Sequence, residues 1–313
     1  MPELPEVENV RLSLNKKILN KKITGVRYHN TIPIKYNTTD EFTGLTQDRY
    51  ITMIERFGKF LVLTLKPHKE PVINLEVQDE PDTTYLICHL GMTGAFLYTD
   101  QKGDYSGNPD SITNHIHVSI DFEDNTELYY SDYRRFGSLR VIDFDTSVTP
   151  NYPSHLKTLF TLGVDAVSKE ETAEIEFVNA IRKRKYYFKP IKQVLLDQTV
   201  VAGVGNIYAS ECLFPNSINP YTPVALVTDE QLKDIFRTNR DIMELSISLG
   251  GSSIRDYVDG DGKSGTFQDH LKVYNQTECS VCGSYIEKTV LDKRATFHCP
   301  ECQPEIDIDA LYD

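Results

Sequence analysis

Apolar residues at helical spacing open the chain: Val7, Val10, Leu14 and Ile18. This pattern predicts a short amphipathic helix from Pro5 to about Leu19. Strand-type segments then dominate up to about Ile142, each bounded by Gly, Pro, Asn or Asp. Examples are residues 23–28, 50–54, 60–65, 85–89, 115–122 and 127–130. Together they predict a β-sandwich or a β-barrel.

After Pro153 the pattern becomes helical. The predicted helices are residues 174–183, 191–197, 205–214 and 229–249. Thr228 and Gln231 stand in capping-box positions for the last helix, and Gly250 is its expected stop. Residues 203–206, Gly-Val-Gly-Asn, predict a turn that opens a helix. Residues 66–84 carry acid and proline without periodicity, so we interpret them as a surface insertion in a hairpin.

Length and composition narrow the class of protein. The chain has 313 residues, of which 40% are hydrophobic and 25% charged, as expected for about two globular domains. Its longest apolar runs are far shorter than the roughly 20 residues that cross a bilayer. The first residues, Met-Pro-Glu-Leu-Pro-Glu, are acidic and contain proline, unlike a signal or transit peptide. We expect the protein to stay in the compartment where it is made.

The net charge alone argues against a polyanionic partner, since 33 Lys and Arg face 46 Asp and Glu, a balance of −13. Cations nevertheless gather between Arg182 and Lys192, where they alternate with Tyr186, Tyr187 and Phe188. Two interpretations stay open for this run: a basic binding face on an acidic body, or the solvated surface of a helix.

Cysteine spacing indicates a metal site. Cys279 and Cys282 form one Cys-x2-Cys pair, and Cys299 and Cys302 form a second. This spacing is typical of a structural zinc ribbon, in which two tight turns present four thiolates to one tetrahedral ion. Two disulfides are the alternative, but a chain without a signal peptide disfavours them. Cys88 and Cys212 stand among apolar residues, and we expect them to be small buried side chains.

Five motifs together resemble the formamidopyrimidine-DNA glycosylases, a family of bifunctional base-excision repair enzymes. They are residues 2–8 (PELPEVE), 89–94 (HLGMTG), 134–137 (RRFG), 191–214 (with LDQ and GVGNIYASE) and 294–299 (RATFHC). The resemblance runs in order from residue 2 to residue 302. It implies an α+β fold with an N-terminal β-sandwich and flanking helices, a helical helix-two-turn-helix domain and a C-terminal zinc-ribbon β-hairpin. The expected boundaries are residues 1–150, 151–272 including a lesion-capping loop, 273–303, and an acidic tail at 304–313.

The N-terminus is the expected reaction centre. A terminal amine has a pKa of about 8, so part of it is free base at neutral pH and can attack the anomeric carbon of a nucleotide. Proline is a secondary amine, and its attack gives an iminium ion that permits strand cleavage by β-elimination. The resemblance implies that Pro2 is the nucleophile once Met1 is removed, that Glu3 is the general acid/base and that Glu6 supports them. It also implies catalytic roles for Lys59 and Arg294.

Further positions match residues that contact DNA in the family. The resemblance implies that Met92, Arg134 and Phe136 fill the space of an extruded nucleotide, with Arg134 reading the orphaned base. It implies phosphate contacts for His89, His115, Arg134 and Asn206, and the nearest substitute for one family lysine is Lys185. By pattern alone, Met92 and Phe136 are ordinary core residues and Lys59 is a surface residue.

The expected protein is therefore a monomeric enzyme with one structural Zn²⁺ that binds duplex DNA in a DNA-containing compartment. It would excise oxidised purines such as 8-oxoguanine and formamidopyrimidines, then cleave the abasic strand by β,δ-elimination. Two alternatives remain. An endonuclease VIII-like glycosylase for oxidised pyrimidines shares the fold, although its N-terminus usually reads Pro-Glu-Gly-Pro. A non-catalytic DNA-binding or scaffold protein would be expected to lose Pro2, Glu3 or Lys59.

Overall fold

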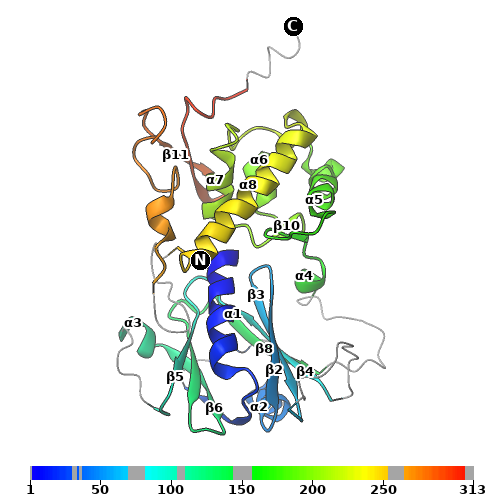
Figure 1. Cartoon of the computed structure of the whole chain (residues 1–313), viewed down its shortest axis with the longest axis vertical. Coiled ribbons are helices and arrows are strands. Elements are labelled where there is room, and N and C mark those ends of the chain that lie inside the picture. The colour runs from blue at the N-terminus through cyan, green and yellow to red at the C-terminus, as the bar shows by residue number, and fades with distance from the viewer. Residues whose placement is uncertain are drawn as a thin grey trace. The chain divides into compact units, whose positions relative to one another are not determined.

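The structure is a computed structural model that describes residues 2–29, 34, 37–69, 82–103, 110–143, 157–252 and 264–306. The chain divides into two compact units (Figure 1). Unit 1 consists of residues 1–153 with 250–265, and unit 2 consists of residues 154–249 with 266–313. None of the described helices combines the length and the apolar character needed to cross a membrane.

Unit 1 is built from two four-stranded antiparallel sheets and helix α1 (Leu4–Ile18). One sheet has the order β1 (Ile23–Tyr28), β6 (Ile116–Phe122), β7 (Glu127–Ser131), β5 (Ala95–Thr99). The other has the order β2 (Tyr50–Phe57), β3 (Phe60–Lys66), β4 (Thr84–His89), β8 (Ser138–Asp143). Two short helices, α2 (Thr39–Thr46) and α3 (Asp110–Thr113), complete it.

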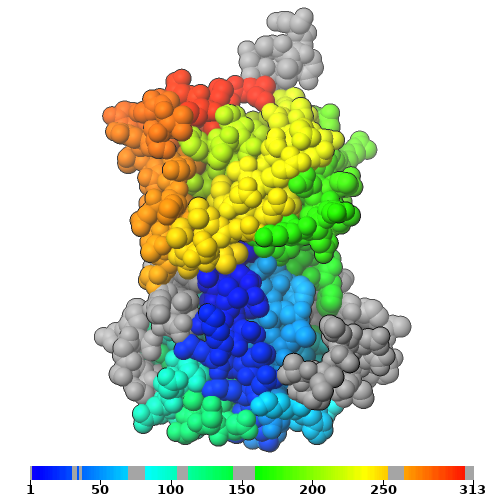
Figure 2. Space-filling model, viewed as in Figure 1, coloured from blue at the N-terminus to red at the C-terminus, as the bar shows by residue number. Residues whose placement is uncertain are grey.

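One continuous apolar core joins α1 to both sheets. The residues that set the helical pattern, Val7, Val10, Leu14 and Ile18, are all fully buried. They pack with alternate residues of the strands, among them Leu61 and Leu63, because successive side chains of a strand point to opposite faces. The opposite face of α1 lies at the surface (Figure 2). The α+β fold class is confirmed, and the sheets form a sandwich rather than a barrel.

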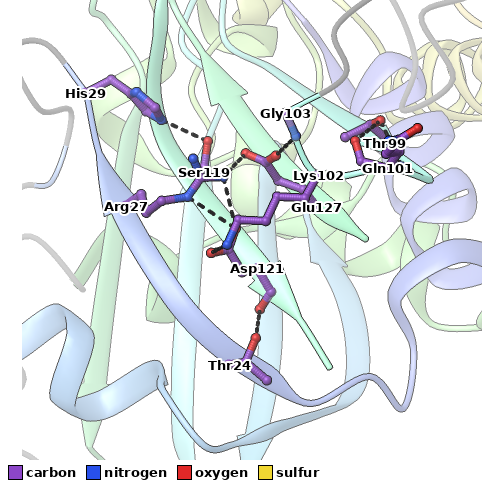
Figure 3. A network of polar contacts seen from close by, with 10 residues as sticks. All are labelled: Thr24, Arg27, His29, Thr99, Gln101, Lys102, Gly103, Ser119, Asp121 and Glu127. Atoms are coloured by element: carbon purple, nitrogen blue, oxygen red, sulfur yellow. Dashed lines mark hydrogen bonds and ion pairs between the residues drawn. The ribbon is translucent and has the colours of Figure 1, made fainter. Parts of the chain in front are cut away.

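A polar network covers part of the β1–β6–β7 sheet (Figure 3). Asp121 and Glu127 face each other across β6 and β7, an arrangement that like charges disfavour. Arg27 of β1 lies between them, 3.0 Å from Asp121 Oδ1 and 2.7 Å from Glu127 Oε1. Lys102 binds Asp121, and the Gly103 N–H donates to Glu127, so the segment after β5 is held to the sheet.

Unit 2 is mainly helical. Its elements are α4 (Lys157–Phe160), β9 (Val164–Asp165), α5 (Ala173–Ile181), a 3-10 turn (Arg184–Tyr186), α6 (Ile191–Leu195), β10 (Val201–Ala202), α7 (Asn206–Leu213), a 3-10 turn (Val224–Leu226), α8 (Asp229–Ser248), a 3-10 turn (Phe267–His270), β11 (Glu287–Leu291) and β12 (Arg294–His298). Helices α5 and α7 both pack on α8 (Figure 1). Strands β11 and β12 form an antiparallel hairpin.

The predicted helix signals of α8 are confirmed. The Thr228 hydroxyl accepts the Gln231 N–H at 3.2 Å, and the Gln231 side chain accepts the Thr228 N–H at 2.9 Å. The helix ends at Ser248, and Gly250 follows in the left-handed region with φ +80°. The predicted turn at residues 203–206 also opens a helix, α7, with Gly205 as its N-cap.

The helical interpretation of the basic run was wrong. Helix α5 ends at Ile181 rather than at Lys183, and residues 184–186 form a 3-10 turn before α6 begins at Ile191. Pro190 cannot donate a backbone hydrogen bond, and this disfavours one helix across the whole run.

Two other predicted segments fall largely outside the described residues. The acidic insertion at 66–84 begins in β3 and ends in β4, which pair as a hairpin, and its residues 70–81 are not described. The capping-loop segment is described only at its two ends, up to Ser252 and again from Ser264.

Candidate functional site

Three predicted catalytic residues lie together at the start of α1. Pro2, Glu3 and Glu6 are all buried, the two glutamates at 2% exposure. The Glu6 carboxylate accepts the Glu3 backbone N–H at 2.8 Å through Oε2, and the Ser252 N–H at 2.8 Å through Oε1. Glu6 therefore holds two segments in place. One is the backbone at Glu3, and the other is Ser252, where the first described part of the capping-loop segment ends.

Lys59 lies in the tight two-residue turn between β2 and β3, where Gly58 has φ +56°. It is 7% exposed, so the surface interpretation of this lysine was wrong. The turn is tied to α1, because Arg56 Nε binds Glu8 Oε2 at 2.9 Å while Arg56 Nη1 donates to the Gly58 carbonyl at 3.2 Å. Glu8 and Arg56 position the turn, and sequence reasoning missed both.

His89 lies beside the Lys59 turn. In the sheet register it pairs with Phe60 on one side and with Ser138 on the other, and the His89 and Phe60 rings are 4.9 Å apart. Its Nδ1 accepts the Gly91 N–H at 3.1 Å. The sheet register thus gathers Lys59, His89 and the loop before Ser138 at one end of the β2–β3–β4–β8 sheet.

Asp132 connects the two loops that carry the predicted DNA-inserting residues. It is fully buried, and its carboxylate accepts the Thr93 hydroxyl through Oδ1 and the Gly137 N–H at 2.7 Å through Oδ2. The Thr93 hydroxyl in turn accepts the Arg134 N–H at 3.1 Å. One aspartate therefore fixes the loop containing Met92 relative to the loop containing Arg134, a role that a lone acid in the sequence does not reveal.

Close backbone packing explains a glycine in each loop. A Cβ on Gly91, which has φ +62°, would come within 2.4 Å of the Gly137 nitrogen. A Cβ on Gly137 would come within 1.9 Å of the Tyr130 hydroxyl. The two loops touch backbone to backbone, and a side chain at either position would force them apart.

Two of the predicted inserting residues, Arg134 and Phe136, are exposed. Phe136 is 54% exposed and carries the Arg134 guanidinium 4.9 Å from its ring centroid, while Met92 is half-buried. The core interpretation of Phe136 was therefore wrong. His115 is exposed as well, and its carbonyl accepts the Asp132 N–H at 3.2 Å. Exposed aromatic and cationic side chains on a rigid support suit insertion into a base stack.

In unit 2 the structure brings Arg294 and Asn206 together. Arg294 is exposed at the start of β12, beside a two-residue turn in which Asp292 and Lys293 have φ +48° and +62°. The next carbonyl, that of Ala295, accepts Asn206 Nδ2 at 2.8 Å and Lys192 Nζ at 3.2 Å. Lys192 also donates to the Thr296 hydroxyl at 2.9 Å and is 1% exposed, so a buried ammonium supports the hairpin.

Lys185 lies outside this cluster. Its Nζ is 4.5 Å from the centroid of the Tyr186 ring, and among the described residues no hydrogen bond or ion pair links it to Asn206 or Arg294. A buried acid of α7, Glu211, was also missed. It accepts the backbone N–H groups of residues 272, 273 and 274, and burial raises its pKa while these three bonds partly oppose the rise. Glu211 attaches the chain entering the zinc ribbon to α7.

The four ribbon cysteines fit one zinc ion. Their sulfur atoms all lie within 4.8 Å of one another. The Cys279 and Cys302 sulfurs are 3.8 Å apart and those of Cys282 and Cys299 are 3.4 Å apart, far beyond a disulfide bond. Tetrahedral Zn–S bonds of about 2.3 Å place sulfurs roughly 3.8 Å apart. One structural Zn²⁺ is thus confirmed as the cofactor. Cys88 and Cys212 are fully buried and form no disulfide, as expected for small buried side chains.

Comparison with known proteins gives the class. Three family models match the chain in order: the formamidopyrimidine-DNA glycosylase N-terminal domain at residues 1–139, its H2TH domain at 162–258, and a zinc finger found in FPG and IleRS at 278–304. Together with the sandwich and the four-cysteine cluster, this order defines a zinc-finger DNA glycosylase.

Curated relatives match over nearly the whole chain. The formamidopyrimidine-DNA glycosylase of Listeria monocytogenes serotype 4b is 35% identical, over 97% of this chain and 100% of its own. That of Ligilactobacillus salivarius is 37% identical, over 97% and 99%. Lactococcus lactis Fpg in complex with abasic-site DNA superimposes with a TM-score of 0.77 at 31% identity, over 97% of this chain and 100% of that chain. The MutM (Fpg) protein of Thermus thermophilus gives 0.76 at 31%, over 97% and 99%. The chain belongs to the formamidopyrimidine-DNA glycosylase family.

Proposed function

We propose that this protein excises oxidised purines, such as 8-oxoguanine and formamidopyrimidines, from duplex DNA and then cleaves the abasic strand. The observation that carries this proposal is the buried Pro2–Glu3–Glu6 cluster at the start of α1, with the buried Lys59 on a turn tied to the same helix. Solved complexes of Lactococcus lactis Fpg with abasic-site DNA and with N7-benzyl-Fapy-dG DNA support the class of substrate.

Base excision begins at the Pro2 nitrogen in this proposal. With Met1 removed, the secondary amine attacks the sugar C1′, and the glycosidic bond breaks with its electron pair leaving on the base. Glu3, adjacent in sequence and buried, donates the proton that the departing base or the opening sugar ring requires. The N–C1′ bond becomes an iminium after the ring oxygen leaves C1′ as the C4′ hydroxyl. No redox partner is consumed.

Strand cleavage follows from the iminium. It withdraws electrons from C2′, so a proton leaves C2′ and the 3′ phosphate departs in the β-elimination. Loss of a further proton expels the 5′ phosphate in the δ-elimination. Lys59 and Arg294 are the cations proposed to neutralise the leaving phosphates or relay a proton. Water then releases the sugar fragment from Pro2.

Access to the lesion requires its extrusion from the helix. We assign Met92 and Phe136 to the vacated space and Arg134 to the orphaned cytosine, because Asp132 holds both loops while Arg134 and Phe136 are exposed. His89, His115, Asn206 and Lys185 are proposed phosphate contacts. The zinc ion supplies structure alone, since four thiolates leave no coordination position for water.

The protein is proposed to act as a monomer. It is proposed to work in the compartment that contains the cell's DNA. The curated relatives named above are bacterial, so this place would be the cytoplasm with its nucleoid.

A panel of duplexes that each contain one defined lesion tests the function. We expect the wild type to cut 8-oxoguanine and formamidopyrimidine duplexes faster than an oxidised pyrimidine, and to leave phosphate at both ends of the gap. Faster cutting of the oxidised-pyrimidine duplex would favour the endonuclease VIII-like alternative. This duplex is included because Lactococcus lactis FPG has been solved in complex with DNA that contains an oxidised pyrimidine. Lesion binding without any cutting by the wild type would indicate a non-catalytic protein.

A further inference from the structure

An exposed aromatic pair stands out on unit 2. Phe188 is 83% exposed and its neighbour Tyr187 is 48% exposed, and their ring centroids lie 4.9 Å apart at an interplanar angle of 85°. Two adjacent exposed rings form a small apolar patch surrounded by polar residues, a feature that often marks a binding surface. Neither residue has a role in the proposed excision reaction.

The backbone holds this pair rigidly. The Tyr187 carbonyl accepts the Ala225 N–H at 3.0 Å, and the Lys189 carbonyl accepts the Val224 N–H at 3.0 Å. On the inner side of the turn, Tyr186 is 2% exposed and its hydroxyl donates to Asp197 Oδ2 at 2.6 Å. The exposed rings therefore sit on a fixed turn and lose little freedom when they bind a ligand.

Cations surround the rings. Lys183, Arg184, Lys185 and Lys189 are all exposed. Among the described residues, no carboxylate forms an ion pair with Lys183, Arg184 or Lys189, whereas the neighbouring Arg182 is neutralised by Asp229 at 2.7 Å. The turn from Lys183 to Lys189, here called the aromatic turn, thus combines exposed ring faces with uncompensated positive charge.

We propose that the aromatic turn binds single-stranded DNA, with an unpaired base stacking on Phe188 and the surrounding cations contacting the backbone. Aromatic rings beside a positively charged path are the usual means of binding single strands. Base faces inside a duplex are already covered by their neighbours, so an intact duplex offers nothing for the ring to stack on. A protein partner fits less well, because lysine is depleted at the centres of protein interfaces.

Equilibrium binding tests this proposal independently of excision. The probe is a fluorescent, undamaged oligothymidylate of about 12 nucleotides, a length within the usual site sizes for single strands. Phe188→Ala and Phe188→Leu should both weaken its binding by roughly 5- to 100-fold, the loss of one stacked base, while Phe188→Trp keeps it. The matched control is Tyr285→Ala, which removes a 76% exposed aromatic from the zinc ribbon of the same unit.

The cation part is tested by salt. Lys189→Ala should reduce the slope of log affinity against log salt by about 0.7, the value for one single-strand phosphate contact. Lys169→Ala, which removes an exposed lysine paired with Glu244, should leave the slope unchanged.

Three results would overturn the proposal. The first is wild-type affinity in Phe188→Leu, because an apolar side chain that replaces the ring without loss indicates a protein-type contact. The second is equal weakening by Tyr285→Ala. The third is a parallel fall in cutting of the 8-oxoguanine duplex by Phe188→Ala, which would assign the ring to the lesion site. The oligothymidylate assay needs no base excision, so its result does not depend on the excision proposal. The two proposals can therefore fail separately.

Discussion

The Lys59 turn of unit 1 and the Arg294 hairpin of unit 2 each present a cation, but they are stabilised in different ways. Lys59 follows β2 and begins the hairpin with β3, whose side chains Leu61 and Leu63 enter a large apolar core. The hairpin of Arg294 has two strands, and its local cluster of buried apolar residues consists of Phe214, Val273 and two of the zinc-ligating cysteines. Packing on the apolar core positions Lys59, whereas zinc-binding thiolates and a few polar contacts position Arg294.

The difference has a physical cause. An isolated two-stranded hairpin is marginally stable in water, because its few side chains bury too little apolar surface. A metal ion held by four thiolates replaces that missing core, and Lys192 and Asn206 add hydrogen bonds to the Ala295 carbonyl. Damage to the metal site should therefore affect one region of the molecule and leave the other intact.

The largest effect is expected from Cys279→Ser. Structural zinc sites contribute on the order of 10 kcal/mol to folding, so loss of one thiolate should release the metal and unfold the β11–β12 hairpin. Hydrogen exchange should show lost protection at residues 287–298, with the strands of unit 1 still protected, and metal analysis should find no zinc. Cys88→Ala, a change of a buried cysteine in the sandwich, is the control and should retain zinc. Equal loss of protection in unit 1 would refute the separation of the two regions.

Glu3→Gln should reduce base excision by roughly 10²- to 10⁴-fold, the usual contribution of a general acid. The amide has nearly the same shape, so affinity for the 8-oxoguanine duplex and the thermal midpoint should change little. Single-turnover excision measures the effect, with Glu171→Gln at an exposed position as the control. Excision at the wild-type rate would remove Glu3 from the chemistry and leave it a buried helix-start residue.

Lys192→Met should act on the second cleavage step alone. The substitution keeps the length of the side chain but removes the charge that binds the Ala295 carbonyl and the Thr296 hydroxyl beside Arg294. We expect the δ-elimination to slow by roughly tenfold, equivalent to one charge-assisted hydrogen bond, so that the β-elimination product accumulates on gels. Lys233→Met on α8 is the control. Slower base excision with an unchanged ratio of products would contradict a positioning role.

Arg134→Ala should change the preference for the opposite base rather than abolish a step of the reaction. If Arg134 reads the orphaned base, the wild type cuts 8-oxoguanine faster opposite cytosine than opposite adenine, and the variant loses most of that ratio, worth about 1 to 3 kcal/mol. His115→Ala is the comparison, because loss of a phosphate contact should weaken both duplexes alike and reduce the salt dependence. An unchanged ratio in Arg134→Ala would leave it a positioning contact.

Local signals in the sequence predicted several regular elements well, although helix α2 was not predicted. The spacing of Val7, Val10, Leu14 and Ile18 predicted α1 to within one residue at each end, and the capping pair Thr228 and Gln231 gave the start of α8. Strand β2 was predicted to end at Ile54 but continues to Phe57, because Glu55 and Arg56 pair with β3 although their side chains are polar.

Contacts between distant parts of the chain could not be predicted in this way. Asp132 to Thr93, Glu8 to Arg56 and Lys192 to Ala295 each join residues far apart in sequence, and no local pattern identifies the partner. The exposure of Phe136 was likewise hidden, since a large aromatic side chain is normally buried. The roles of Pro2, Glu3, Lys59 and Arg294 rest on the resemblance and stay predictions that experiments must test.

The central claim is that the Pro2 nitrogen forms the covalent link to DNA. Borohydride reduction during turnover of the 8-oxoguanine duplex, followed by protease digestion and mass spectrometry of the adduct, tests it directly. We expect one modified peptide, which begins at Pro2 without Met1 and carries the sugar on its terminal nitrogen. A protein extended at its N-terminus should form no adduct, whereas the same extension at the C-terminus should not interfere. An adduct on Lys59 or another lysine, or full excision by protein that retains Met1, would contradict the account.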